Sequence, residues 1–285
     1  MPVLLGLADT TALSNREAIQ RPTGTHLVGL YLFFLASPLP CRGVFNLFGH
    51  EVPWRAMEKR PVAVFDIDGT IFRSSLLIEL SKRLIQDGIF SKEVQAEFEQ
   101  ERLDWQERRG SYEAYIGKVV ELFAHEIKGK PYEEIANIAG EIIEYRKDRV
   151  YRYTRDLIKE LKSGGYFLLA ISHSPKFIVD GFGYEHGFDK VYGTFYTSGP
   201  SERFTGEIED RDLIFNKAAV LTRALRKENL TLEDSFGVGD TESDIPMLEM
   251  VATPIAFNPN QSLLTHAARR GWKVVVERKD VIYEL

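Results

Sequence analysis

The chain has 285 residues, a formal net charge of −6 and a hydrophobic content of 44%, so it is long enough to bury a full core. Its 36 basic and 42 acidic residues leave no positive excess, which argues against nucleic-acid binding. A single cysteine, Cys41, excludes an internal disulfide framework and suits a reducing compartment. We therefore expect a cytoplasmic protein with one large domain, or a core domain that carries an insertion.

The first part of the chain, residues 1–60, differs from the rest and is interpreted as an N-terminal extension. Its apolar run Leu27–Leu35 is shorter than the roughly 20 residues that a membrane span needs. The run could be a signal-peptide core, but no small-residue cleavage site follows it. Alternatively, the chain starts at Met57, which leads directly into the first strand. We favour a poorly ordered or non-native extension over secretion, and membrane attachment is not expected.

The next element is an apolar run, Val62–Phe65, that ends at two aspartates, Asp66 and Asp68. In a strand, residues two apart point to the same side, so both carboxylates would project together. Two such charges are costly unless a cation neutralises them or one carboxyl holds a proton. A calcium loop would continue with further oxygen ligands, whereas Ile71 follows here. The pattern therefore predicts a ligand site at the end of this strand.

Helical periodicity follows the first strand without an intervening strand. It predicts four helices, over residues 76–87, 91–109, 112–127 and 132–150. An α/β domain normally returns to its sheet after one helix, so we interpret residues 76–153 as an all-helical cap inserted over the strand's end. Trp105, Tyr112 and Tyr115 are expected to form the core of this cap rather than to contact substrate.

After the insert, strands and helices alternate again. The pattern predicts strands at 166–171, 234–238, 254–257 and 272–276, helices at 154–162, 212–228, 245–250 and 261–270, and a short hairpin within 191–208. This alternation is typical of an α/β fold, a Rossmann-like doubly wound parallel sheet. The core domain would comprise residues 61–75 and 154–285.

Polar residues suited to one reaction follow the predicted strands. Ser172 follows the second apolar strand, Asp240 and Asp244 follow a later one, and Lys217 lies in the helix before it. The carboxyl ends of parallel strands meet at one edge of the sheet, so these side chains should lie close together. Several carboxylates, without a cluster of histidines and cysteines at the spacing of a zinc site, suit Mg²⁺. Ser172 could instead cap a helix, and Asp244 could do so in addition to binding metal.

Four motifs in order make the pattern specific. They are Asp66-Ile67-Asp68-Gly69-Thr70, Ser172, Lys217 and the segment Gly239-Asp240-Thr241-Glu242-Ser243-Asp244. From about Pro61 onward, the chain resembles a haloacid dehalogenase (HAD) superfamily hydrolase of subfamily IB, which is phosphoserine-phosphatase-like and has a C1-type cap. The resemblance implies a Mg²⁺-dependent phosphatase that acts on a small phosphorylated metabolite through an aspartyl-phosphate.

The resemblance also implies a role for each motif residue. Asp66 would be the nucleophile and Asp68 the general acid and base. Ser172 and Lys217 would bind the phosphate. Mg²⁺ would be held by Asp66, by Asp68 through its backbone carbonyl, by Asp240 and by Asp244.

Some residues depart from the phosphoserine phosphatase pattern. Ser75 stands where a glutamate would meet the amino group of phosphoserine, and His173 and Ser174 replace two glycines. These differences disfavour phosphoserine as the substrate. Arg73 could bind an anionic substrate or pair with a cap carboxylate. Two alternative functions stay open, a phosphotransferase that uses the same intermediate and a non-catalytic HAD-fold binding protein, and the oligomeric state is not predicted.

Overall fold

The computed structural model describes residues 59–285, which belong to one unit spanning Ala56–Leu285. The predictions for Leu27–Leu35, Cys41 and a start at Met57 concern residues outside the described part. Between residues 59 and 285, no helix combines the length and apolar character needed to cross a bilayer.

A seven-stranded sheet forms the centre of the fold, in the order β3-β2-β1-β6-β7-β8-β9. All neighbouring pairs are parallel except β8 and β9. The strands are β1 (Arg60–Phe65), β2 (Phe167–Pro175), β3 (Lys190–Thr194), β6 (Leu230–Gly239), β7 (Thr253–Phe257), β8 (Lys273–Arg278) and β9 (Val281–Glu284). The chain moves outward in one direction from β1 to β3 and in the other from β6 to β9, so a switch point lies between β1 and β6. The predicted doubly wound α/β fold is confirmed.

The residues of β1 alternate between two hydrophobic clusters, one on each face of the sheet. Ala63 and Phe65 belong to one cluster, and Val62 and Val64 to the other. The first face is covered by α5 (Arg152–Ser163) and α6 (Lys176–Glu185), and the second by α8 (Lys217–Lys227), α9 (Ile245–Leu248) and α10 (Gln261–Arg270). Burial on both faces explains why the central strands are continuous apolar runs.

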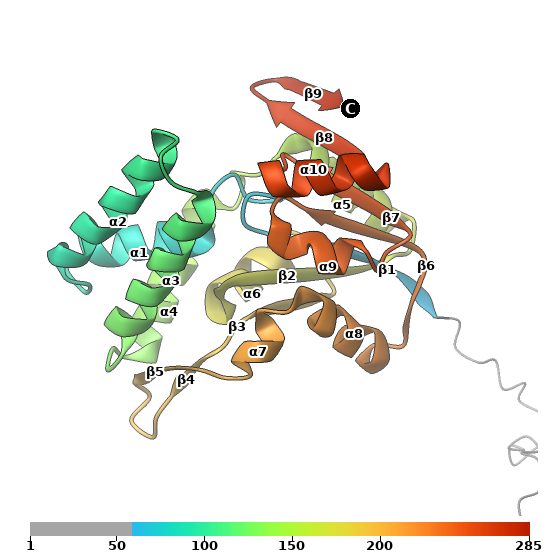
Figure 1. Ribbon diagram of the computed structural model, residues 1–285. Helices are drawn as coiled ribbons and strands as arrows, with labels where there is room; N and C mark the ends of the chain where they lie inside the picture. Colours follow the sequence, from blue (N-terminus) through green and yellow to red (C-terminus); the bar gives the residue numbers. More distant parts are fainter. Residues whose placement is uncertain (1–58) are drawn as a thin grey trace, which may run out of the picture. The chain divides into compact units, whose positions relative to one another are not determined.

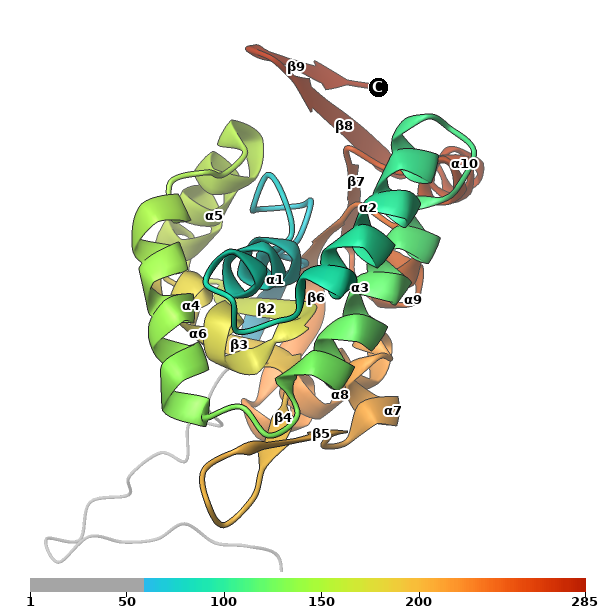
Figure 2. The same cartoon turned by 90° about the vertical axis from the view of Figure 1, so that its left-hand side faces the viewer.

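Four helices lie beyond the carboxyl ends of the strands (Figures 1 and 2). They are α1 (Leu76–Gln86), α2 (Lys92–Gln106), α3 (Tyr112–Ile127) and α4 (Tyr132–Arg146). The cluster that contains Phe65 continues into them through residues such as Phe123 and Ile135. A small hairpin, β4 (Tyr196–Ser198) and β5 (Phe204–Ile208), adds a backbone hydrogen bond from Phe204 to Lys130 (3.0 Å). The division into core and cap domains stays a prediction.

The strand β2 runs on to Pro175, so Ser172 lies within it rather than after it as predicted. Three further details differ from the sequence pattern. Residues 191–208 do not form only a hairpin, because β3 joins the main sheet beside β2 before β4 and β5 begin. The helix predicted over 212–228 is two helices, α7 (Arg211–Ile214) and α8, because the Asn216 side chain accepts a hydrogen bond from Ala219 N and caps α8. The antiparallel edge strand β9 was not predicted.

Candidate active site

Asp66 lies at the carboxyl end of β1, next to the switch point. Its backbone N–H donates to Val238 O of β6 (3.0 Å). The ammonium of Lys217 lies 2.5 Å from Oδ1 of Asp66 and 2.5 Å from Oδ1 of Asp244. Burial raises the pKa of Asp66 to about 7 against the opposing charge of Lys217, and the carboxylate of Asp244 adds to the rise. One lysine therefore does not offset the buried acidic charge.

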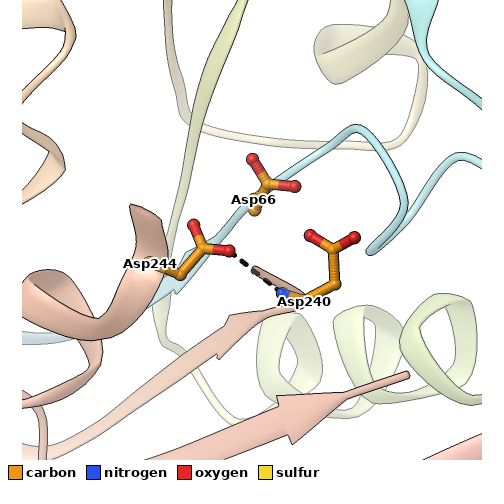
Figure 3. Close-up of side chains that lie close together, drawn as sticks. All are labelled: Asp66, Asp240 and Asp244. Atoms are coloured by element: carbon orange, nitrogen blue, oxygen red, sulfur yellow. Dashed lines mark hydrogen bonds between the residues drawn. The ribbon is translucent and has the colours of Figure 1, made fainter. Parts of the chain in front are cut away.

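Asp240 completes a carboxylate cluster with Asp66 and Asp244 (Figure 3). One oxygen from each lies within 4.8 Å of the others. The second oxygen of Asp244 accepts hydrogen bonds from the backbone N–H groups of Asp240 (3.0 Å) and Thr241 (3.1 Å), so this side chain caps the turn and faces the cluster at once. Burial, followed by the charges of Asp66 and Asp244, holds the pKa of Asp240 well above its ordinary value. Three oxygen donors with uncompensated negative charge are suited to Mg²⁺.

Gly69 allows the loop after β1 to approach this cluster. Its φ of +83° lies in the left-handed region, and a Cβ at this position would lie 2.2 Å from Oδ2 of Asp240. The neighbouring hydroxyl of Thr70 donates to Oδ1 of Asp240 (3.3 Å). Gly69 therefore leaves room for the Asp240 carboxylate, and the Thr70 hydroxyl holds it from the loop after the neighbouring strand β1.

Asp68 is held by three donors. Its Oδ2 accepts from the hydroxyls of Ser172 (2.6 Å) and Ser174 (2.8 Å), and its Oδ1 accepts from Leu76 N (2.6 Å). Ser172 does not cap a helix, since Pro175 occupies the N-cap position of α6. The Ser174 hydroxyl also accepts from Leu77 N (3.1 Å) and so joins β2, Asp68 and α1.

A small cavity of about 80 Å³ opens over these groups. It is lined by Asp66, Asp68, Asp240 and Lys217, and also by Tyr112 of α3. The structure thus brings together every residue predicted for the site: Asp66, Asp68, Ser172, Lys217, Asp240 and Asp244.

Sequence patterns missed several residues that line the cavity, and Ser174 and Tyr112 are two of them. Ser174 was noticed only as a departure from the family motif, and its short spacing from Ser172 along one strand was the available signal. Tyr112 was assigned to the cap core; it does contact Trp105 (5.3 Å between ring centroids), but it also lines the cavity.

His173 also lines the cavity, although no role was predicted for it. Its ring stacks on Phe215 with centroids 4.9 Å apart. Burial, reinforced by the charge of Lys217, lowers the pKa of His173 to about 3. The imidazole is therefore neutral at physiological pH.

Comparison with known proteins identifies the family. Residues 63–249 match the model of the haloacid dehalogenase-like hydrolases. An "Inhibition of morphological differentiation protein" from Streptomyces azureus is 26% identical over 244 residues, which cover 82% of this chain and 81% of the relative. A histidinol-phosphatase from Neisseria meningitidis serogroup C is 26% identical over 220 residues, covering 75% of this chain and 97% of the relative.

A solved structure agrees with the fold. A phospho-aspartyl intermediate analogue of phosphoserine phosphatase superposes with a TM-score of 0.54 at 22% identity, covering 78% of this chain and 96% of that one. At this identity the likeness concerns the fold alone. The family model spans more than half of the chain and includes motif residues from Asp66 to Asp244. The resemblance seen in the motifs is confirmed: this chain belongs to the haloacid dehalogenase-like hydrolase family.

Proposed function

We propose that the protein is a Mg²⁺-dependent phosphatase that hydrolyses a small phosphomonoester through an aspartyl-phosphate on Asp66. The observation that carries this proposal is the position of the Asp66 carboxylate. It lines the same cavity as Asp68 and Lys217 and belongs to the acidic cluster with Asp240. A nucleophile, a proton donor and compensating charge are the groups that phosphoryl transfer requires.

The reaction would proceed in two displacements. A carboxylate oxygen of Asp66 attacks phosphorus, the bond to the alcohol oxygen breaks, and Asp68 gives its proton to the leaving alkoxide. Asp68 then takes a proton from water, whose oxygen attacks the phosphorus and releases Asp66 and inorganic phosphate. The hydrogen bonds from Ser172 and Ser174 fix the orientation of Asp68 for both transfers.

The carboxylates of Asp66, Asp240 and Asp244, with the backbone carbonyl of Asp68, would hold the Mg²⁺. Two observations indicate that these residues suit Mg²⁺. The cluster offers carboxylate oxygens as ligands. Burial also raises the pKa values of Asp66 and Asp240 when no divalent cation is present, which indicates negative charge that a cation would offset. When bound, the ion offsets negative charge on the phosphate and on the carboxylates around it. Lys217 contributes further positive charge, because its ammonium lies between Asp66 and Asp244 and contacts both carboxylates.

The substrate is expected to be a small phosphorylated metabolite other than phosphoserine. Ser75 offers no carboxylate for an amino group, and its side chain accepts a hydrogen bond from Ile78 N as the N-cap of α1. The position is therefore used to start a helix. We further propose a cytoplasmic location, on the ground that the one cysteine, Cys41, suits a reducing compartment.

A phosphomonoester panel tests the proposal. Purified protein with Mg²⁺ should release phosphate from at least one member, and chelation should stop the release. Asp66→Asn should abolish turnover, whereas Asp212→Asn, a change at an exposed residue of α7, should leave it intact. Rapid acid quench followed by peptide mass spectrometry should detect phosphate on Asp66. Turnover that survives Asp66→Asn or excess chelator would contradict the mechanism.

A further inference from the structure

A second pocket adjoins the active-site cavity. Its volume is about 530 Å³, within the range of roughly 300–1,000 Å³ that is typical of small-molecule sites. The two hollows share Ser75, Tyr112, Asp240 and Thr241 in their walls. The larger pocket therefore directly adjoins the cavity in which the scissile phosphate would lie.

The walls of this second pocket carry four cationic side chains: Arg73, Lys82, Arg102 and Arg108. Its one carboxylate, among the residues that line it, is Asp240, which belongs to the acidic cluster already described. Arg102 pairs with Glu99. Within residues 59–285, none of the other three cations has a carboxylate at salt-bridge distance. Within the described part of the chain, the charges of Arg73, Lys82 and Arg108 thus have no carboxylate partner.

Arg73 contacts an aromatic ring instead of a carboxylate of the cap helices. Its guanidinium lies over the ring of Tyr151 at 5.0 Å from the centroid. Trp105 and Tyr115 stack on each other with centroids 5.9 Å apart and form another part of the wall. Flat apolar faces beside cations can bind a spacer of several carbon atoms together with a charged end group.

We propose that the physiological substrate carries a second anionic group, a carboxylate or a second phosphate, which binds among Arg73, Lys82 and Arg108. This inference rests on the proposed function, since it assumes that the scissile phosphate occupies the cavity at Asp66. The same charges oppose a substrate whose distal group is an ammonium. The pocket would therefore select phosphomonoesters with a distal anionic group over phosphomonoesters with a distal ammonium, by electrostatic complementarity.

Matched substrate pairs test this selection. Fructose 1,6-bisphosphate is compared with fructose 6-phosphate, and 3-phosphoglycerate with glycerol 3-phosphate, so that the two pairs separate a second phosphate from a carboxylate. Phosphoethanolamine supplies the cationic case. We expect kcat/KM to be about tenfold higher for the doubly anionic member of at least one pair, equivalent to about 1.4 kcal/mol, and lowest for phosphoethanolamine. Ratios near one in both pairs would overturn the inference.

Substitutions in the second pocket test whether its cations cause the preference for a second anionic group. Lys82→Gln and Arg108→Gln should each lower the kcat/KM ratio of the preferred pair, by about threefold to tenfold, chiefly through KM. Arg269→Gln, at an exposed position of α10 outside the pocket, is the matched control and should keep the ratio. An unchanged ratio in Lys82→Gln, Arg108→Gln and the double variant would also overturn the inference.

Two measurements distinguish a failure of this inference from a failure of the proposed phosphatase function. Hydrolysis of p-nitrophenyl phosphate, which has no second anion, reports the chemistry alone, and its absence would count against the proposed function. Calorimetric binding of the same pairs to Asp66→Asn with Mg²⁺ reports the pocket without turnover. Tighter binding of the doubly anionic member supports the inference, and equal binding contradicts it.

Discussion

Lys217 lies 2.5 Å from Asp66, although 151 residues separate the two in sequence. The same ammonium lies 2.5 Å from Asp244, and all three side chains are buried. Burial opposes the charge of Lys217, but Asp244 and Asp66 outweigh that effect and raise the pKa of its ammonium. Lys217 is therefore a permanent cation between two carboxylates.

Replacing Lys217 with Met should destabilise the metal-free protein by about 3–5 kcal/mol, because two buried carboxylates lose their partner. Turnover should fall at least a hundredfold, since the nucleophile also loses its orientation. Urea unfolding in chelator and steady-state kinetics measure the two effects. Lys227→Met, at the exposed end of α8, should change neither.

Asp240→Asn should have opposite effects with and without metal. In chelator, the variant should unfold at a higher temperature than the wild type, because one member of a repelling carboxylate cluster becomes neutral. With Mg²⁺ added, the wild type should gain stability and the variant should gain little. Thermal unfolding across a Mg²⁺ titration tests this crossover, with Glu160→Gln on the surface of α5 as control. An equal Mg²⁺ response in both proteins would remove Asp240 from the metal site.

Gly69→Ala should impair metal binding as well as folding. The new Cβ would lie 2.2 Å from Oδ2 of Asp240, and the backbone φ is +83°. Gly88→Ala provides a close control, because its φ is +74° but no atom lies within 4 Å of the added Cβ. Both variants should lose roughly 1 kcal/mol to backbone strain. Only Gly69→Ala should also weaken Mg²⁺ activation, and similar activation constants in both would contradict the predicted clash.

Ser174→Ala should lower kcat by about tenfold to a hundredfold, because Asp68 loses one of its hydroxyl donors and Leu77 N loses its acceptor. The loss should be non-additive with Ser172→Ala, since both hydroxyls bond to the same carboxylate oxygen. A double-mutant cycle on kcat measures this coupling. Ser163→Ala, at the exposed end of α5, should behave as the wild type.

His173 should make the protein less stable in acid. Its pKa is lowered to about 3 by burial, whereas the unfolded chain takes up a proton near pH 6.5. This contribution to stability is present above pH 6.5 and is lost as the pH falls toward 3. From pH 7 to pH 5, the wild type should lose about 2 kcal/mol more than His173→Phe. Urea unfolding at both pH values measures the difference, and an equal loss in the two proteins would contradict the prediction.

The sequence predicted best those features that depend on residues close together in the chain. The spacing of Asp66 and Asp68 after an apolar run predicted two carboxylates at a strand end, and the parallel sheet placed Asp240 beside them. The α3 helix was predicted at its observed bounds, Tyr112–Ile127, from its helical periodicity.

The remaining features depend on contacts that the sequence does not encode locally. Residues 191–194 alternate as a hairpin strand would, and only the pairing of Val191 with Ala170 places them in the main sheet. The bond between Ser174 and Asp68 depends on the register of β2 against β1. Likewise, Tyr112 reaches the cavity because of how α3 lies across the strand ends, which helical periodicity alone does not specify.

The pairing of β1 with β6 has a consequence for how the protein folds. Residues that meet there, such as Phe65 and Val238, are far apart in the chain, so the contact closes a very long loop. Contacts of this kind form slowly and late. The carboxylates of Asp66 and Asp240 thus repel each other only once the centre of the sheet has assembled. We expect Mg²⁺ to slow unfolding rather than to accelerate folding, so that the metal acts on the lifetime of the native state.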